Sequence, residues 1–209
     1  LVVQPTHLMH GAEYDEMVEA IEKYQDKFEQ VAVAEPLLGE VGDDAAVINA
    51  DKEAVAKAVV AEEASEAGFK DAADAADQGT AFVLMGHGTA HVAKVTYSQM
   101  QTQMQNLGYS NVFIGTVEGE PEETSCESVI EAVKAAGYKN VVLRPLMVVA
   151  GDHANNDMAG DDDDSWKSQF EASGAFDKVD TQISGLGRIK AVESFYVAHT
   201  RTAIDSIAK

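Results

Sequence analysis

Residues 141–158, VVLRPLMVVAGDHANNDM, decide the fold of this chain. The stretch begins as an almost uninterrupted apolar run, which is typical of a strand buried on both faces of a parallel sheet. It then passes through Gly151 and His153 into a segment of amides and carboxylates. Ligands of open parallel sheets bind beyond the carboxyl ends of the strands. The stretch therefore predicts a buried strand that ends at a functional edge.

Short apolar runs alternate with amphipathic windows along the chain, and this alternation predicts an α/β fold with parallel strands and crossover helices. Thr124 and Glu127 fit a capping box for the fourth helix, and Gly137 fits its C-terminal stop. We expect strands at residues 1–4, 31–38, 81–85, 112–117, 141–149 and 179–184. We expect helices at residues 14–28, 52–67, 91–107, 125–136, 165–172 and 190–208.

An internal repeat indicates a duplicated, two-domain chain. The stretch VVQPTHLMHGAEYDEM, which begins at residue 2, superposes at an offset of 140 on VLRPLMVVAGDHANNDM, which begins at residue 142. The matched positions are Pro5 with Pro145, Gly11 with Gly151, and Glu13 with His153. We predict two similar parallel-sheet domains, residues 1–78 and 79–209, with the boundary in the alanine-rich stretch 68–80. The second domain has two strand–helix units before the repeat, so we expect the first domain to lack its N-terminal half.

The composition excludes several classes of partner. The chain has 15 Lys and Arg against 36 Asp and Glu, and its formal net charge of −21 repels nucleic acid and anionic membranes. No apolar run approaches the roughly 18 residues of a membrane span. Cys126 is the only cysteine, which leaves histidines and carboxylates as the metal ligands that the chain can offer.

Three ionisable residues follow predicted strands at the edge where a ligand would bind. They are Glu13, His87 in MGHGTAH, and His153 in AGDHANND. One loop histidine is weak evidence for a site, but two histidines and a glutamate at equivalent strand ends favour a mixed His/carboxylate site for a divalent ion.

Other readings of these segments fail on spacing. His91 stands where a dinucleotide loop needs its third glycine, and Gly88 stands where a zincin needs its general-base glutamate. The loop after His153 has Trp166 at the closing position of an EF-hand. A phosphate-binding loop and a nucleophile elbow are also missing from the sequence, so we expect no nucleotide cofactor. The simplest interpretation of Asp161–Asp164 is a solvated helix N-terminus.

Four segments carry a resemblance to a known family. They are HLMHGAEYDE (residues 7–16), MGHGTAH (85–91), RPLMVVAGDHANNDMAGDDDDSWK (144–167) and SGLGRIKAVESFYVAHT (184–200). Together they resemble the anaerobic cobalt chelatases that act on sirohydrochlorin in cobalamin biosynthesis, which belong with the class II chelatases. The resemblance covers nearly the whole chain.

The resemblance implies a function and a site. It implies two similar α/β domains facing each other across a cleft, and insertion of a divalent metal into a tetrapyrrole without nucleotide hydrolysis. His87 and His153 match the family's metal-site histidines and Glu13 its glutamate, so these three are expected to bind the ion and to act in catalysis, one histidine accepting a pyrrole proton. The metal is a substrate, with Co²⁺ expected and Fe²⁺ or Ni²⁺ suited to the same ligands.

Some alternatives stay open at this point. The same fold could serve a tetrapyrrole-binding protein without turnover, or a dechelatase that handles haem. The sequence also leaves open whether copies of the chain form a homo-oligomer, and whether the protein is cytoplasmic, as we expect, or periplasmic. Because sirohydrochlorin is itself a polycarboxylate, Arg144 or Lys94 could offset the negative charge near the cleft. The ring edges could instead remain in solvent, where salt screens them.

Overall fold

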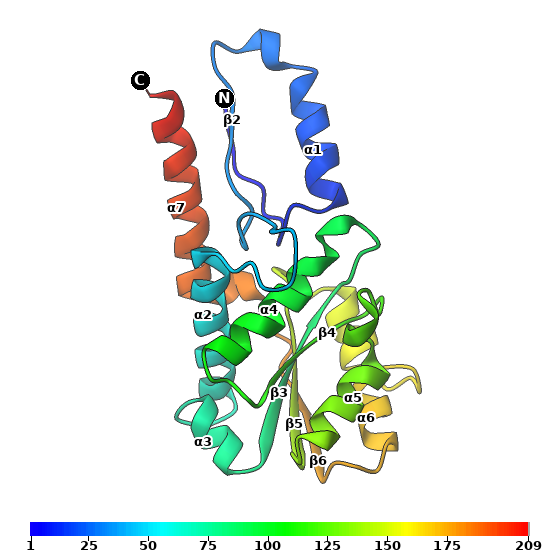
Figure 1. Ribbon diagram of the computed structural model, residues 1–209. Coiled ribbons are helices and arrows are strands. Elements are labelled where there is room, and N and C mark those ends of the chain that lie inside the picture. The colour runs from blue at the N-terminus through cyan, green and yellow to red at the C-terminus, as the bar shows by residue number, and fades with distance from the viewer. Residues whose placement is uncertain (209) are drawn as a thin grey trace.

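The computed structural model describes residues 1–208 and confirms the predicted α/β fold with parallel sheets (Figure 1). A two-stranded parallel sheet lies in residues 1–49, the small lobe, and a four-stranded parallel sheet lies in residues 50–189, the large lobe. The small sheet pairs β1 (Val2–Val3) with β2 (Ala32–Val33). The large sheet has the spatial order β4 (Val112–Thr116), β3 (Thr80–Gly86), β5 (Asn140–Pro145), β6 (Lys178–Thr181).

Helices cover both faces of the large sheet. One face packs against α2 (Ala50–Glu66) and α4 (Val95–Asn106), and the other against α5 (Cys126–Ala135) and α6 (Trp166–Ala172). The other α-helices are α1 (Ala12–Glu22), α3 (Ala72–Asp77) and α7 (Lys190–Ile207). Short 3₁₀ turns lie at Gln25–Lys27, Val92–Lys94, Glu122–Thr124 and Leu186–Arg188, and a π-helical turn at Ala154–Met158.

The central strand β3 explains why the sequence of a buried strand is apolar throughout. Successive side chains of a strand point to opposite faces. Phe82 and Leu84 belong to the core under α2 and α4, whereas Val83 and Met85 belong to the core under α5 and α6. All four side chains are fully buried, so neither face of β3 can carry a polar residue without a partner.

The helix α7 ties the two lobes together. It begins in the core of the large lobe, where Val192 is fully buried, and then runs beside β1 and β2 (Figure 1). The helix α2, on the other side of the boundary predicted at residues 78 and 79, packs Val55 and Val59 into the large-lobe core. The small and large lobes are therefore defined by which elements pack together, and they do not coincide with the predicted domains. The predicted domain boundary and the predicted duplication remain predictions.

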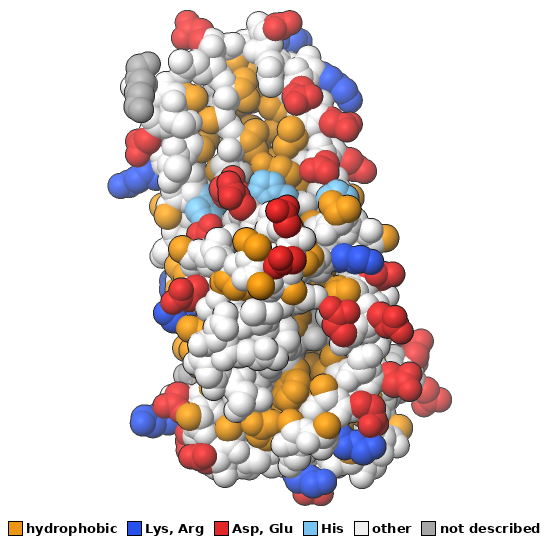
Figure 2. All heavy atoms as spheres, in the orientation of Figure 1, with side chains coloured by type: hydrophobic (Ala, Val, Ile, Leu, Met, Phe, Trp, Pro, Cys, Tyr) orange, Lys and Arg blue, Asp and Glu red, His pale blue; other side chains and the backbone are white. Residues whose placement is uncertain are grey.

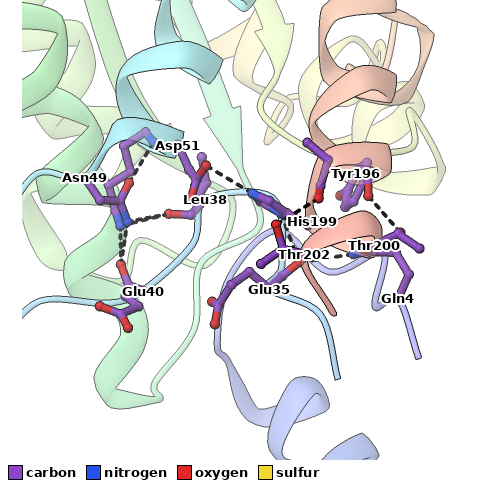
Figure 3. A network of polar contacts seen from close by, with 12 residues as sticks. Gln4, Glu35, Leu38, Glu40, Asn49, Asp51, Tyr196, His199, Thr200 and Thr202 are labelled. Carbon is purple, nitrogen blue, oxygen red and sulfur yellow. Dashed lines mark hydrogen bonds and ion pairs between the residues drawn. The ribbon is translucent and has the colours of Figure 1, made fainter. Parts of the chain in front are cut away.

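A polar network fixes α7 to the small lobe and to the start of α2 (Figure 3). The His199 ring on α7 contacts the Glu35 carbonyl through Nδ1 and the Asp51 carboxylate through Nε2, each at 3.1 Å. Thr200 donates to the Gln4 side chain at 2.8 Å. Because both partners of His199 are acceptors, both bonds form when the ring carries two protons.

A second polar group is buried between α2 and the large sheet. Arg144 on β5 is completely buried and donates to the Glu66 carboxylate and, at 2.7 Å, to the Gln182 side chain. Glu63 is also completely buried, and neither of its carboxyl oxygens has a partner in the described chain. Burial raises the pKa of the Glu63 carboxyl well above its usual range, although the charge of Arg144 opposes this shift.

Several predicted elements have different bounds in the structure. The helix expected at residues 14–28 ends at Glu22, and the strand expected at 31–38 is reduced to Ala32–Val33. The strand expected at 141–149 ends at Pro145, after which the chain bends to pair its backbone with residues 186 and 187. Tertiary contacts, rather than local apolar character, set these ends.

Two further expectations were wrong in detail. The predicted capping box is not formed: Ser125, not Thr124, caps α5 by accepting the Ser128 N–H, while Thr124 bonds the Thr116 hydroxyl at 2.6 Å. The alanine-rich stretch 68–80, for which we expected no helix, contains the complete helix α3, capped by Asp71. No helix in the described part of the chain combines the length and the apolar character needed to cross a membrane.

Candidate functional site

A cavity of about 730 Å³ opens between the two lobes. This volume lies within the range of small-molecule binding sites in proteins. The small lobe contributes the segment after β1, including Thr6–Met9 and Glu13, and the large lobe contributes the ends of β3, β4 and β5 with His87, Glu118 and Leu146–Val148. The cavity therefore lies at the carboxyl ends of the parallel strands, as the sequence predicts.

The large lobe brings two of the predicted site residues together. The rings of His87 and His153 stand almost perpendicular, at 83°, with centroids 4.6 Å apart. His87 is exposed and lines the cavity, and His153 is half-buried beside it. Figure 2 shows histidine side chains at the level where the lobes meet. Two neighbouring imidazoles that solvent can reach form a natural pair of metal ligands.

His87 stands in the turn Gly86–His87–Gly88 that ends β3. Its Nδ1 atom lies 2.8 Å from the Gly88 carbonyl, which is an acceptor, so Nδ1 carries the proton. Gly88 has a φ of +93°, a left-handed conformation that favours glycine. The turn therefore leaves Nε2 as the nitrogen with a free lone pair.

His153 begins the π-helical turn at Ala154–Met158, and π-turns are frequent at functional sites. Its Nδ1 atom donates to the Asp157 carboxylate at 2.6 Å. A carboxylate on the far nitrogen fixes the ring and makes Nε2 a better metal ligand. Asp157 is thus the member of the acidic stretch that contacts the site. Asp161–Asp164 are exposed and precede Ser165, which caps α6, in agreement with the predicted solvated helix start.

Glu13 lies on the other wall of the cavity. It is exposed in the first turn of α1 and lines the cavity with His87. Within residues 1–208, however, no three His, Cys, Asp or Glu side chains are grouped closely enough to hold a metal ion. The two histidines are brought together and the glutamate lines the cavity from the small lobe, so the three-residue ligand set remains a prediction.

Three residues that line the cavity were not found from the sequence. Glu118 follows β4 as His87 follows β3, and it lines the same wall of the cavity. Its strand-end position was a usable signal, hidden among the carboxylates of VEGEPEE. His7 lines the small-lobe wall, and its Nδ1 atom is buried without a partner in the described chain. Tyr97 reaches the cavity from α4, which no local motif reveals.

His91, to which we assigned no function, joins the lobes beside the cavity. Its Nδ1 atom accepts the Ala93 N–H at 3.2 Å, so the ring proton resides on Nε2. That nitrogen lies 3.2 Å from the Asp15 carboxylate on α1. His91 is therefore engaged at both nitrogens and has none free for a metal ion.

The suggestion that Arg144 offsets the negative charge near the cleft was wrong. Its side chain is fully buried against α2 and cannot reach a ligand in the cleft. Lys94 is bound to Glu120 at 2.7 Å. Among the described residues that line the cavity there is no lysine or arginine.

Comparison with known proteins identifies the family. Residues 1–205 match the family described as Cobalt chelatase (CbiK). A sirohydrochlorin cobaltochelatase of Salmonella typhimurium is 30% identical over 205 residues, covering 98% of this chain and 69% of that protein. Sirohydrochlorin cobaltochelatase CbiKC of Nitratidesulfovibrio vulgaris is 32% identical over 209 residues, covering 99% and 66%. The chain thus spans about two thirds of the length of these relatives.

Solved structures support the fold. SirB from Bacillus subtilis with Fe³⁺ superposes with a TM-score of 0.62 at 16% identity, covering 98% of this chain and 72% of that one. The sirohydrochlorin chelatase SirB from Bacillus subtilis subspecies spizizenii, in complex with cobalt, gives a TM-score of 0.57 at 14% identity, covering 99% and 70%. The resemblance read from the sequence is confirmed: this chain belongs to the cobalt chelatase (CbiK) family.

Proposed function

We propose that the protein inserts a divalent metal ion, with Co²⁺ as the preferred substrate, into sirohydrochlorin during cobalamin biosynthesis, without consuming a nucleotide. The observation that carries the proposal is the His87–His153 pair, in which both Nδ1 atoms are engaged and both Nε2 atoms remain available. Family membership supports metal chelation, and the sequence lacks a phosphate-binding loop.

In this mechanism the large lobe delivers the ion. His87 and His153 bind the metal through Nε2 on one side of the macrocycle, and a carboxylate from Glu13 or Glu118 completes its coordination. Few protein ligands and a site open to the cavity keep the ion exchangeable. The four ring nitrogens can then replace the protein ligands.

Insertion also requires that two pyrrole N–H bonds break while the pyrrole nitrogens form bonds to the metal. Each histidine has one free nitrogen, so a histidine that binds the ion through Nε2 cannot accept a proton at the same time. This argues against our expectation that one of the pair is the base while both are ligands. Glu13 and Glu118 are carboxylates in the cavity that can take the protons and pass them to water.

The direct test is metal insertion followed by the visible absorption of the ring. The purified chain is mixed anaerobically with metal-free sirohydrochlorin and Co²⁺, Fe²⁺ or Ni²⁺, with and without ATP. We expect insertion fastest with Co²⁺ and at the same rate without ATP. Haem offered in parallel detects the alternative: release of iron from haem, or tetrapyrrole binding without any turnover, would contradict the proposal.

Variants connect the activity to the site. His87→Ala and His153→Ala should each lower turnover by more than about a hundredfold, the upper end of the losses seen for outer partners of metal ligands. His10→Gln is the matched control, because His10 contacts Glu35 at 2.6 Å and does not line the cavity. Equal losses in all three variants would point to general unfolding instead.

A further inference from the structure

Tyr97 is a buried aromatic residue that contacts the turn carrying His87. It lies in the first turn of α4 and is only 3% exposed, yet it forms part of the cavity wall. Buried tyrosines normally use the hydroxyl group in a hydrogen bond, so its partners show what the residue does.

The Tyr97 hydroxyl holds the backbone beside His87. Its oxygen accepts the Gly88 N–H at 3.1 Å. The Gly88 carbonyl in turn accepts the Nδ1 proton of His87 at 2.8 Å. A continuous chain of contacts therefore leads from the phenol oxygen through Gly88 to the imidazole ring.

The two glycines of the turn fit this arrangement. A Cβ atom on Gly86 would lie 2.3 Å from Cε1 of Tyr97, so the absence of a side chain makes room for the aromatic ring. A Cβ atom on Gly88 would lie 2.8 Å from Cβ of Glu118, and the φ of this residue is positive. Gly86 therefore admits the ring that holds the turn, and Gly88 gives the turn its shape.

The phenol is suited to a fixed, neutral contact. Burial raises the pKa of Tyr97, and the nearby charge of Glu13 raises it further, while the backbone N–H groups of residues 87 and 88 oppose the shift. The hydroxyl keeps its proton at neutral pH and remains an acceptor for the Gly88 N–H.

We propose that Tyr97 is a positioning residue for metal insertion: its hydroxyl fixes the Gly86–His87–Gly88 turn, so that His87 keeps Nδ1 on the Gly88 carbonyl and presents Nε2 to the ion. This inference rests on the proposed function, because it takes His87 as a metal ligand. It assigns to Tyr97 for His87 the task that Asp157 performs for His153.

The test is Tyr97→Phe, which keeps the ring beside Gly86 and removes only the oxygen. We expect Co²⁺ affinity and kcat to fall about tenfold, in the range for outer partners of metal ligands. We also expect a changed visible absorption spectrum of the bound Co²⁺, while KM for sirohydrochlorin changes less than about twofold because ring contacts are kept. Tyr138→Phe is the matched control, since within residues 1–208 its hydroxyl contacts only Ser110, at 3.5 Å, and it does not line the cavity.

A second variant changes the contact between Tyr97 and the turn at Gly86 instead of at Tyr97. Gly86→Ala removes no hydrogen-bonding group but pushes against the Tyr97 ring, so it should change the Co²⁺ spectrum in the same way. It also provides the test if Tyr97→Phe does not fold. A Tyr97→Phe protein with the wild-type Co²⁺ spectrum and kcat, but a lower melting temperature, would overturn the inference and leave Tyr97 a purely structural residue. Failure of the wild-type protein to insert any metal would instead refute the proposed function.

Discussion

The imidazole rings of His87 and His153 meet at 83° with their centroids 4.6 Å apart, although 65 intervening positions separate them in the sequence. The parallel sheet brings them together, because β3 and β5 are neighbours and both histidines follow the carboxyl ends of these strands. In both turns Nδ1 is held by a nearby acceptor. The sheet thus sets the separation of the rings, and the turns set which nitrogen each one offers.

Asp157→Asn tests whether the carboxylate on His153 matters as a charge. The amide keeps an acceptor of the same shape but removes the negative charge 2.6 Å from Nδ1, so Nε2 becomes a weaker ligand. We expect Co²⁺ affinity, measured by calorimetry, to fall about tenfold, and Asp157→Ala to lower it further. Asp163→Asn, in the exposed part of the acidic stretch, is the control. An unchanged affinity in Asp157→Asn would show that the hydrogen bond alone suffices.

Salt should help this protein bind its polycarboxylate substrate. The net charge is −21, and the described cavity wall has no lysine or arginine to attract the ring substituents. Raising NaCl from about 20 mM to about 200 mM shortens the distance over which charges repel. We expect KM for sirohydrochlorin to fall at saturating Co²⁺. A tetrapyrrole with fewer carboxylates should show a weaker effect, and a KM that rises with salt would reveal a cationic subsite.

The close approach of Gly185 to the segment after β5 gives a third prediction. A Cβ atom on Gly185 would lie 2.6 Å from the Val148 carbonyl and 2.8 Å from the Ala150 nitrogen. Because the backbone of Gly185 is extended, Gly185→Ala acts by steric pressure alone. We expect unfolding free energy to fall by about 1–3 kcal/mol, the usual cost of overpacking, together with a loss of turnover.

Gly151→Ala is the matched control for that variant. It adds a methyl group on the segment after β5 that Gly185 approaches, at a position where nothing lies within 4 Å. Its melting temperature, followed by circular dichroism, should equal that of the wild type. Because Gly→Ala lowers the entropy of the unfolded chain, it should not destabilise by itself, so equal destabilisation in both variants would mean that the close contact of Gly185 is not the cause.

The sequence predicts the large sheet well because its strands are buried on both faces. Residues 81–85 were predicted as a strand and β3 spans Thr80–Gly86, since no polar side chain interrupts the run. The helix α3 was missed because its composition, AADAAD, offers no large apolar residue. Asn111 stabilises this helix by donating to the Ala72 carbonyl from 39 residues away, and local sequence cannot reveal such a contact.

The site divides in the same way. His87 and His153 could be found because a histidine just after a buried strand is conspicuous and the sheet rule places it at the ligand edge. Tyr97 and Asp157 could not be assigned from the sequence. Tyr97 contacts Gly88 from helix α4, and Asp157 contacts His153 through a π-helical turn. Their functions depend on contact geometry, which periodicity does not encode.

The buried carboxyl of Glu63 gives a prediction about stability and pH. In the unfolded chain a glutamate ionises near its ordinary pKa of about 4.3, whereas in the fold burial keeps Glu63 protonated to higher pH. Above the unfolded pKa the folded state therefore binds more protons than the unfolded state. The stability contributed by this group is complete below that pH and is lost as pH rises toward the folded pKa.

Glu63→Gln removes this titration while keeping a neutral group of nearly the same shape. We expect the variant and the wild type to have similar melting temperatures near pH 4, and the variant to gain relative stability as pH increases to 9, by up to about 1.4 kcal/mol per pH unit within the window. Glu62→Gln is the control, because Glu62 is the neighbouring residue of the same helix and is only partly buried. Its melting temperature should change with pH as that of the wild type does. If the two curves for Glu63→Gln and wild type stay parallel over this range, the Glu63 carboxyl is ionised in the fold and Arg144 neutralises it.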